Sequence, residues 1–136
     1  LKFHPVPVYL GAEDVELLSW QPPTAQLITP ADGQEIAVGR RSVRCLMTPG
    51  HTPGGICYRV DDPQTPVCFV GDTLFAGSIG RTDLPGGDYE TLLRSITGTL
   101  FTFPDASVVY SGHGPETTIG REKASNPFVL EYLARR

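Results

Sequence analysis

The stretch Val67-Cys-Phe-Val-Gly-Asp-Thr-Leu-Phe75 gives the first indication of how this chain folds and where its polar chemistry lies. It opens with four apolar residues in a row, which is typical of a β-strand buried on both faces. Gly71 and Asp72 follow at once, so we expect the strand to end in a tight turn that carries a carboxylate. Taken alone, an Asp in this position is more often a helix cap or part of an Asx turn than a functional group.

Two other segments repeat this order, in which an apolar strand is followed by a polar side chain in a Gly-rich turn. They are Thr-Pro-Gly-His-Thr-Pro-Gly-Gly at residues 48–55, which contains His51, and Tyr-Ser-Gly-His-Gly-Pro at residues 110–115, which contains His113. Binding sites are commonly built from loops at strand ends. Two imidazoles together with the Asp72 carboxylate suit zinc, iron or manganese. The spacing by itself leaves a metal site and three ordinary loop residues as equal alternatives.

The rest of the chain indicates one α/β (α+β) domain, in which strands come first and are followed by helix, strand and helix. Apolar alternation or short apolar runs predict further strands at Val6–Leu10, Ile36–Val38, Val43–Met47, Ile56–Val60 and Ser107–Tyr110. Helical spacing and capping residues predict helices from Ala12 to near Trp20, from Tyr89 to Leu100 with Asp88 as N-cap, and after Asn126-Pro127. Prolines and an Asp-Gly turn predict a loop over residues 21–34.

Composition argues against several kinds of function. The 136 residues carry a net charge of -4 and no cluster of Lys and Arg, so we expect no nucleic-acid partner. The apolar stretches are far shorter than the about 20 residues that span a membrane, so we expect no membrane partner. Cys45, Cys57 and Cys68 form no CxxC pair and lie in apolar segments. We therefore expect reduced, buried thiols and a cytoplasmic protein.

Three segments together resemble the third, fourth and fifth motifs of the metallo-β-lactamase superfamily, in the form found in glyoxalase II-like (hydroxyacylglutathione hydrolase-like) enzymes. They are TPGHTPGG at residues 48–55, GDTLFAGSIGRTDLPGGD at residues 71–88 and GHGPETTIG at residues 112–120. The resemblance extends from about Ile36 to Pro127. It implies an αβ/βα sandwich built from two similar halves, with the site along one edge between the sheets.

The resemblance also implies a role for each polar side chain. His51 matches a ligand of the first metal ion, Asp72 matches the carboxylate that bridges both ions, and His113 matches a ligand of the second ion. It therefore implies two divalent metal ions, zinc first and iron or manganese as alternatives, with Asp72 as the catalytic residue of this chain. Arg81, in the Gly-Arg-Thr-Asp segment at residues 80–83, matches a residue near the substrate entrance; the alternative is a structural turn.

One signature of that family is absent from this sequence. The His-x-His-x-Asp-His segment, which supplies four ligands from the N-terminal half of the sandwich, has no counterpart here. The remaining histidine, His4, precedes a strand where the family has no ligand, so we expect it on the surface. The chain also enters an apolar segment almost directly after Leu1. We therefore expect residues 1–136 to be a partial domain, the C-terminal half of the sandwich.

For the intact protein, the resemblance implies hydrolysis of a small-molecule thioester such as S-D-lactoylglutathione by a metal-bound hydroxide. The isolated half is expected to be inactive and to associate with itself through the sheet face that the other half would cover. One alternative is a non-haem iron persulfide dioxygenase, which also carries a Gly-Arg-Thr-Asp segment. In those enzymes an acidic-aromatic pair follows the last histidine, whereas here Gly114-Pro115 does. The other alternative is a non-catalytic fragment that binds a partner.

Overall fold

A six-stranded mixed β-sheet lies at the centre of the computed structural model, which describes residues 6–19 and 26–136. Its strands are β3 (Glu35–Val38), β4 (Arg41–Met47), β5 (Ile56–Val60), β6 (Val67–Gly71), β9 (Val108–Ser111) and β10 (Thr117–Thr118). The order across the sheet is β10-β9-β6-β5-β4-β3, and all neighbours are antiparallel except β6 and β9. Strands β4, β6 and β9 therefore run in the same direction and end at the same edge.

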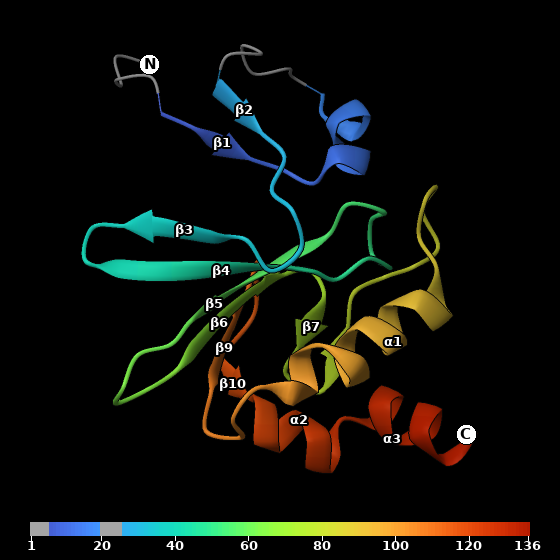
Figure 1. Ribbon diagram of the computed structural model, residues 1–136. Helices are drawn as coiled ribbons and strands as arrows, with labels where there is room; N and C mark the ends of the chain where they lie inside the picture. Colours follow the sequence, from blue (N-terminus) through green and yellow to red (C-terminus); the bar gives the residue numbers. More distant parts are fainter. Residues whose placement is uncertain (1–5, 20–25) are drawn as a thin grey trace.

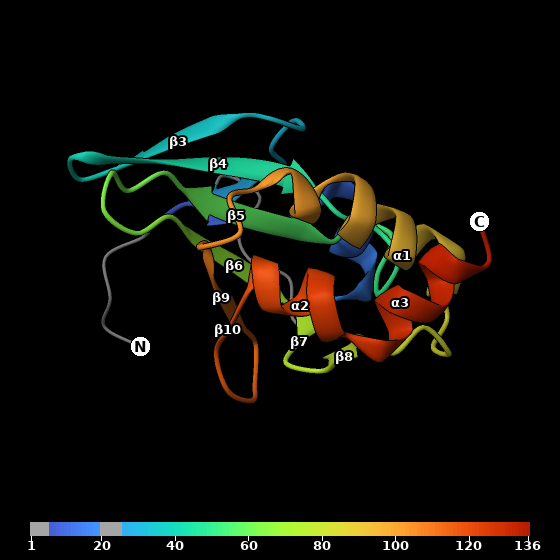
Figure 2. The ribbon, with the colours of Figure 1, turned by 90° about the horizontal axis from the view of Figure 1, so that it is seen from below.

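Three helices cover one face of this sheet (Figures 1 and 2). They are α1 (Tyr89–Gly98), α2 (Ile119–Ser125) and α3 (Pro127–Ala134), and a short 3-10 helix, η3 (Leu100–Thr102), follows α1. The Asp88 side chain caps α1 by accepting a hydrogen bond from the backbone N–H of Thr91 at 2.9 Å, and Asn126 caps α3. The helix starts predicted at Asp88 and at Asn126 are confirmed, and so are the strands expected around β3, β4 and β5.

The hydrophobic core fills the space between the sheet and these helices. Side chains of β5, β6 and β9 meet side chains of α1, η3 and α3, and the fully buried members include Cys57, Cys68, Val109, Leu92, Leu93, Ile96, Leu100 and Val129. Each buried side chain of leucine size contributes about 1.5–3 kcal/mol relative to exposure. The cysteines behave as predicted: all three are buried free thiols, and burial raises the pKa of Cys57 to about 11.

The opposite face of the sheet is less covered than the sequence predicts. Residues 67–70 were expected to be buried on both faces, yet Phe69 is 46% exposed, and the neighbouring Tyr110 of β9 is 41% exposed. Their rings stack with centroids 5.7 Å apart. Cys68 and Val70 alone point into the helix-covered core, because successive side chains of a strand point to opposite faces. The prediction of a doubly buried strand is therefore wrong for this chain.

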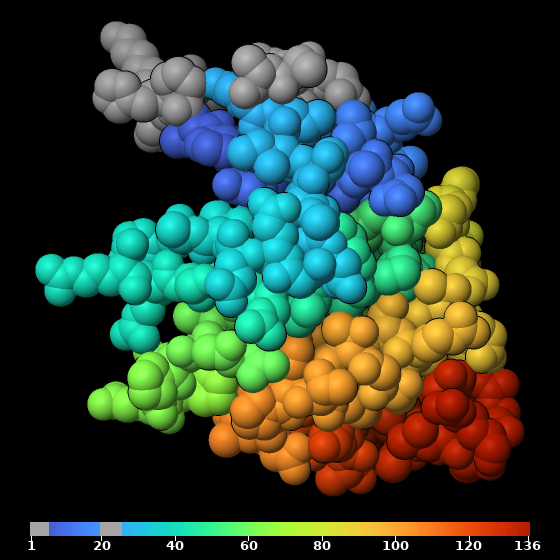
Figure 3. All heavy atoms as spheres, viewed as in Figure 1, coloured from blue at the N-terminus to red at the C-terminus, as the bar shows by residue number. Residues whose placement is uncertain are grey.

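The N-terminal segments lie on the side of the sheet away from α2 and α3 and pack against the rest of the chain (Figures 1 and 3). Strand β1 (Val8–Tyr9) is shorter than expected and pairs in parallel with β2 (Leu27–Ile28). The loop predicted over residues 21–34 is therefore wrong at the two residues of β2. The predicted α-helix is a 3-10 helix, η1 (Ala12–Leu17), which buries none of its side chains. Such short pieces with little packing favour the 3-10 form.

Two small elements near the sheet edge have no counterpart among the predicted ones. Strands β7 (Leu74–Phe75) and β8 (Ser78–Ile79) form an antiparallel hairpin. Two-residue strands carry no readable periodicity, so the sequence pattern could not indicate them. His4 and Trp20, to which the sequence assigned a surface position and a helix end, lie outside the described residues. In the described part of the chain, no helix is long and apolar enough to cross a membrane.

Candidate metal centre

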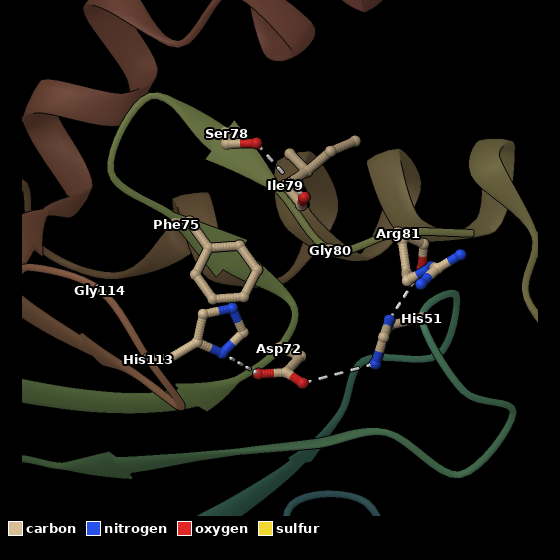
Figure 4. A pocket seen from close by; sticks show the side chains of 9 residues that line it. All are labelled: His51, Asp72, Phe75, Ser78, Ile79, Gly80, Arg81, His113 and Gly114. Atoms are coloured by element: carbon tan, nitrogen blue, oxygen red, sulfur yellow. Dashed lines mark hydrogen bonds and ion pairs between the residues drawn. The ribbon is translucent and has the colours of Figure 1, made fainter. Parts of the chain in front are cut away.

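The three polar side chains predicted as ligands meet at one edge of the sheet (Figure 4). His51 follows β4, Asp72 follows β6 and His113 follows β9, and these are the three strands that end at the same edge. His51 Nε2 lies 3.6 Å from Asp72 Oδ2, and His113 Nδ1 lies 3.4 Å from Asp72 Oδ1. Each carboxylate oxygen thus faces a different imidazole.

A backbone carbonyl selects the tautomer of a neutral His51 ring. Its Nδ1 lies 2.8 Å from the carbonyl oxygen of Arg81. Because a carbonyl can only accept, the neutral ring carries its proton on Nδ1, and its Nε2 lone pair lies on the side of Asp72. A metal-binding histidine is commonly oriented in this way by an acceptor on its far nitrogen. His51 is also the less exposed of the two imidazoles, at 23% against 74% for His113.

The loop that carries His51 is tied to η1 through a carboxylate. Asp14 accepts hydrogen bonds from the Thr52 hydroxyl at 2.5 Å and from the backbone N–H of Gly54 at 2.7 Å. In the sequence, Asp14 is one of three acidic residues near the start of the predicted helix, and nothing in that position indicates this role. Its hydrogen bonds to the His51 loop depend on how η1 packs, so no local pattern could have revealed them.

The same loop is anchored to α1 from its other side. The Ser95 hydroxyl donates to the carbonyl of Pro49 at 2.7 Å, and the backbone N–H of Asp88 donates to the carbonyl of Gly50 at 2.8 Å. Gly50 has φ 139°, and a Cβ there would lie 2.3 Å from the Cα of Leu92. Glycine is therefore required for the loop to pack this closely against the helix. His51 is held between η1 and α1.

Glycines also make room for the Asp72 carboxylate. Gly71, with φ 53°, turns the chain out of β6 immediately before Asp72. A Cβ on Gly80 would lie 1.8 Å from the Asp72 carbonyl oxygen, and a Cβ on Gly112 would lie 2.6 Å from Asp72 Oδ1. The backbone therefore lies against the Asp72 carboxylate at Gly112 and against the Asp72 main chain at Gly80, as expected for a Gly-rich strand-end site.

A cavity of about 420 Å³ opens at this centre. Beside the three polar residues it is lined by Phe75, Ser78, Ile79, Gly80, Arg81 and Gly114. The Phe75 ring packs on the His113 ring with centroids 4.6 Å apart. Figure 4 shows Phe75 and Ile79 on the same side of the cavity. The arrangement offers an apolar wall next to two imidazoles and a carboxylate, as in many small-molecule sites.

Arg81 contributes to the site in a way that the sequence did not indicate. Its side chain forms two hydrogen bonds with Asp83, at 2.8 and 2.9 Å, and this pairing lowers the pKa of Asp83. The guanidinium is thus engaged with a neighbouring carboxylate at the cavity rim, and its role toward a substrate stays a prediction. The backbone carbonyl of Arg81, by contrast, contacts His51 directly.

The donor set is compatible with two metal ions that share one carboxylate. Among residues 6–19 and 26–136, no three His, Cys, Asp or Glu side chains surround one point as the ligands of one ion would. One imidazole and one carboxylate oxygen are available on each side of Asp72. Both donor types bind borderline divalent cations. The described residues of this chain would thus supply two donors to each ion.

Comparison with known proteins agrees with this geometry. Residues 5–113 match the family described as the metallo-beta-lactamase superfamily. The probable metallo-hydrolase YqgX of Bacillus subtilis is 47% identical over 105 residues, covering 77% of this chain and 48% of that protein. The hydroxyacylglutathione hydrolase GloC of Haemophilus influenzae is 46% identical over 98 residues, covering 72% and 45%. The chain thus spans about half the length of these curated relatives.

Solved structures give the same result. The BLEG-1 B3 metallo-beta-lactamase superposes with a TM-score of 0.79 at 37% identity, covering 90% of this chain and 65% of that one. TTHA1623, solved in a di-iron-bound form, superposes with a TM-score of 0.72 at 33% identity. The match covers 90% of this chain and 64% of that one. ETHE1 from Myxococcus xanthus superposes with a TM-score of 0.70 at 38% identity. The match covers 76% of this chain and 46% of that one. With its α/β fold, its strand-end histidines and these matches, the chain belongs to the metallo-beta-lactamase superfamily.

Proposed function

We propose that the protein containing this chain is a two-metal hydrolase whose substrate is a thioester of the S-D-lactoylglutathione type. The observation that carries the proposal is the position of Asp72, with one carboxylate oxygen toward His51 and the other toward His113. The relative named hydroxyacylglutathione hydrolase, 46% identical over 72% of this chain, supports the substrate class. Zinc is the proposed metal, with iron and manganese as alternatives.

Divalent metal ions held at this site would supply the Lewis acidity that activates a water molecule and polarises the substrate carbonyl. The residues of this chain would hold and orient those ions. Asp72 offers an oxygen to each side, and the His51 Nε2 lone pair is kept free by the hydrogen bond from Nδ1 to the Arg81 carbonyl. Phe75 and Ile79 line the cavity beside the centre and exclude water from that side of a bound substrate.

This chain by itself is proposed to be inactive. A tight catalytic zinc site normally has three protein ligands on one ion, whereas each side of Asp72 offers one imidazole and one carboxylate oxygen. The chain spans about half the length of its curated relatives. The remaining ligands and the group that orients the attacking water are therefore expected outside residues 1–136.

The test is hydrolysis of S-D-lactoylglutathione by the full-length gene product loaded with zinc, followed as thiol release. Asp72→Asn should lower kcat/KM at least about 100-fold. Mutation of a residue that only orients a metal ligand already lowers metal affinity or activity about 10–100-fold. The matched control is Asp105→Asn. Asp105 pairs with Lys123 at 2.9 Å and does not line the cavity, so its rate should stay within about 2-fold of the unaltered protein. Full activity of Asp72→Asn would refute the proposal.

A persulfide dioxygenase is the second candidate, favoured by the Gly-Arg-Thr-Asp segment at residues 80–83. The two candidates differ in their use of oxygen. A dioxygenase consumes oxygen with one iron ion per site, whereas the hydrolase consumes none. An oxygen electrode with glutathione persulfide as substrate separates them, and rapid uptake without thioester turnover would favour the dioxygenase.

A further inference from the structure

Glu122 is a buried carboxylate that lies outside the metal centre. It belongs to α2 and is 1% exposed. Oxygen Oε1 accepts from the backbone N–H of Gly77 and from the Asn126 amide, both at 2.9 Å, and Oε2 accepts from the Thr117 hydroxyl at 2.5 Å. Within residues 6–19 and 26–136, none of the ion pairs involves Glu122. Burying a carboxylate without a cation costs free energy of folding, and hydrogen bonds such as these three offset part of that cost.

Asn126 extends this network to a second backbone group of the β7–β8 hairpin. Its side-chain oxygen accepts from the backbone N–H groups of Phe128 and Val129, which caps α3. Its amide nitrogen donates to Glu122 and also to the carbonyl of Ser78, at 3.0 Å. Glu122 and Asn126 thus bind the two adjacent residues at the turn of the hairpin, where Gly77 has φ 73°.

The hairpin belongs to residues 74–81, which we call the wall segment and which contacts both imidazoles of the metal centre. Phe75, near its start, packs on the His113 ring at 4.6 Å between centroids. Arg81, at its end, accepts from His51 Nδ1 through its backbone carbonyl at 2.8 Å. Figure 4 shows this segment running along the cavity from Phe75 to Arg81. A shift of the wall segment would therefore displace the support of both histidines.

We propose that Glu122 and Asn126 are positioning residues for the metal centre. By holding the turn of the wall segment, they fix Phe75 against His113 and the Arg81 carbonyl against His51. The alternative is a purely structural role, in which Glu122 only joins α2 to its neighbours. The proposal rests on the proposed function only in that the two imidazoles bind metal, and its main test does not depend on catalysis.

The test compares Glu122→Met with Glu122→Gln in the full-length gene product. Methionine fills a similar volume but leaves the Gly77 N–H without an acceptor. Glutamine keeps an oxygen for Gly77 and Asn126, and the Thr117 hydroxyl can turn round to accept from its amide. A third variant, Asn126→Asp, keeps the acceptor that caps α3 but loses the donor to both Ser78 and Glu122 and places a second carboxyl group beside Glu122. Val129→Ala is the control, because it leaves a cavity where α3 packs on the core while the backbone N–H of residue 129 can still donate to Asn126.

Two measurements follow, namely hydrogen exchange of residues 74–81 and titration with Co²⁺ watched by its visible absorption. Glu122→Met and Asn126→Asp should speed exchange of the wall segment about 10-fold and weaken Co²⁺ binding about 10–100-fold with a changed spectrum. For Glu122→Gln, the exchange rate of residues 74–81 and the Co²⁺ affinity should both stay within about 3-fold of the values for the unaltered protein. Val129→Ala should lower thermal stability while its Co²⁺ spectrum stays unchanged.

The purely structural role predicts a different pattern. In that case Glu122→Met and Asn126→Asp would lose thermal stability like Val129→Ala, with unchanged Co²⁺ affinity and unchanged exchange of residues 74–81, and the positioning role would be refuted. Should the unaltered protein bind Co²⁺ but hydrolyse no thioester, the proposed substrate would fail while these two measurements would still decide the role of Glu122.

Discussion

At the scale of single residues, the metal centre depends on how Asp72 presents its two oxygens. They lie 3.6 Å from His51 Nε2 and 3.4 Å from His113 Nδ1. This position is available only because residue 112 has no side chain, since a Cβ on Gly112 would lie 2.6 Å from Asp72 Oδ1. Non-bonded carbon and oxygen atoms do not approach so closely, so any larger residue must displace the carboxylate.

The first prediction is that Gly112→Ala weakens metal binding at least about 10-fold, because the carboxylate must rotate away from one imidazole. Zinc affinity of the full-length gene product, measured by competition with a chromophoric chelator, checks it. Gly98→Ala is the matched control: no atom lies within 4 Å of its Cβ position in α1, and alanine favours the helix by about 0.5–1 kcal/mol. Equal zinc affinity in both variants would contradict the geometry described for Asp72.

The three residues proposed as ligands were accessible from the sequence, but the groups that support them were not. His51, Asp72 and His113 each follow an apolar strand in a Gly-rich turn, and this repeated pattern is local. The Arg81 carbonyl and the Asp14 carboxylate act through contacts between segments 30 or more residues apart. No spacing rule encodes such contacts, because they depend on how the loops pack in three dimensions.

At the scale of the elements, α1 supports the centre through its first turns. Its predicted start and its apolar stripe were readable because ten residues contain almost three helical turns and an N-cap. The cap residue, Asp88, also donates its backbone N–H to the Gly50 carbonyl in the His51 loop. The β7–β8 hairpin was missed although it lines the same cavity, because each of its strands has only two residues.

The second prediction concerns the pH dependence of this cap. Hydrogen bonds from the Thr91 hydroxyl and backbone lower the pKa of Asp88 below its ordinary value of 3.8. A carboxyl whose pKa is lower in the folded state stabilises the fold above pH 3.8 and loses that contribution as the pH falls through the folded value. At pH 7, Asp88→Ala should therefore lower Tm by a few degrees, and the difference should shrink as the pH falls below 3.8 through the folded pKa.

Asp88→Asn is the control for this measurement. Asparagine caps helices about as well as aspartate but does not titrate in this range. Its Tm at pH 7 should lie close to that of the unaltered protein, and the acid-dependent part of the stability should be smaller. A Tm difference between Asp88→Ala and the unaltered protein that persists unchanged down to pH 2 would show that the carboxylate charge does not contribute to the cap.

At the scale of the whole molecule, one face of the sheet has two stacked aromatic rings in contact with solvent. Phe69 is 46% exposed and Tyr110 is 41% exposed. The sequence predicted a strand buried on both faces at residues 67–70, and its apolar composition does suit such burial. Composition indicates what a strand face can pack against, but it does not indicate whether that partner lies within the same 136 residues.

The third prediction is that residues 1–136, expressed alone, associate through this face. Even about 500 Å² of apolar surface removed from water is worth roughly 12 kcal/mol at about 25 cal/mol per Å². Size-exclusion chromatography with light scattering should show dimers or larger species, and Phe69→Lys should shift the distribution toward monomer. A monodisperse monomer of 14.7 kDa that binds no hydrophobic dye would contradict the prediction.

Asp72 would hold two metal ions, one together with His51 and one together with His113. This proposal can be tested by anomalous X-ray diffraction from crystals of the zinc-loaded full-length gene product, collected at the zinc edge. We expect two anomalous peaks, each within ligand distance of one Asp72 oxygen and one of the two imidazoles. A single peak, or zinc bound away from Asp72, would contradict it.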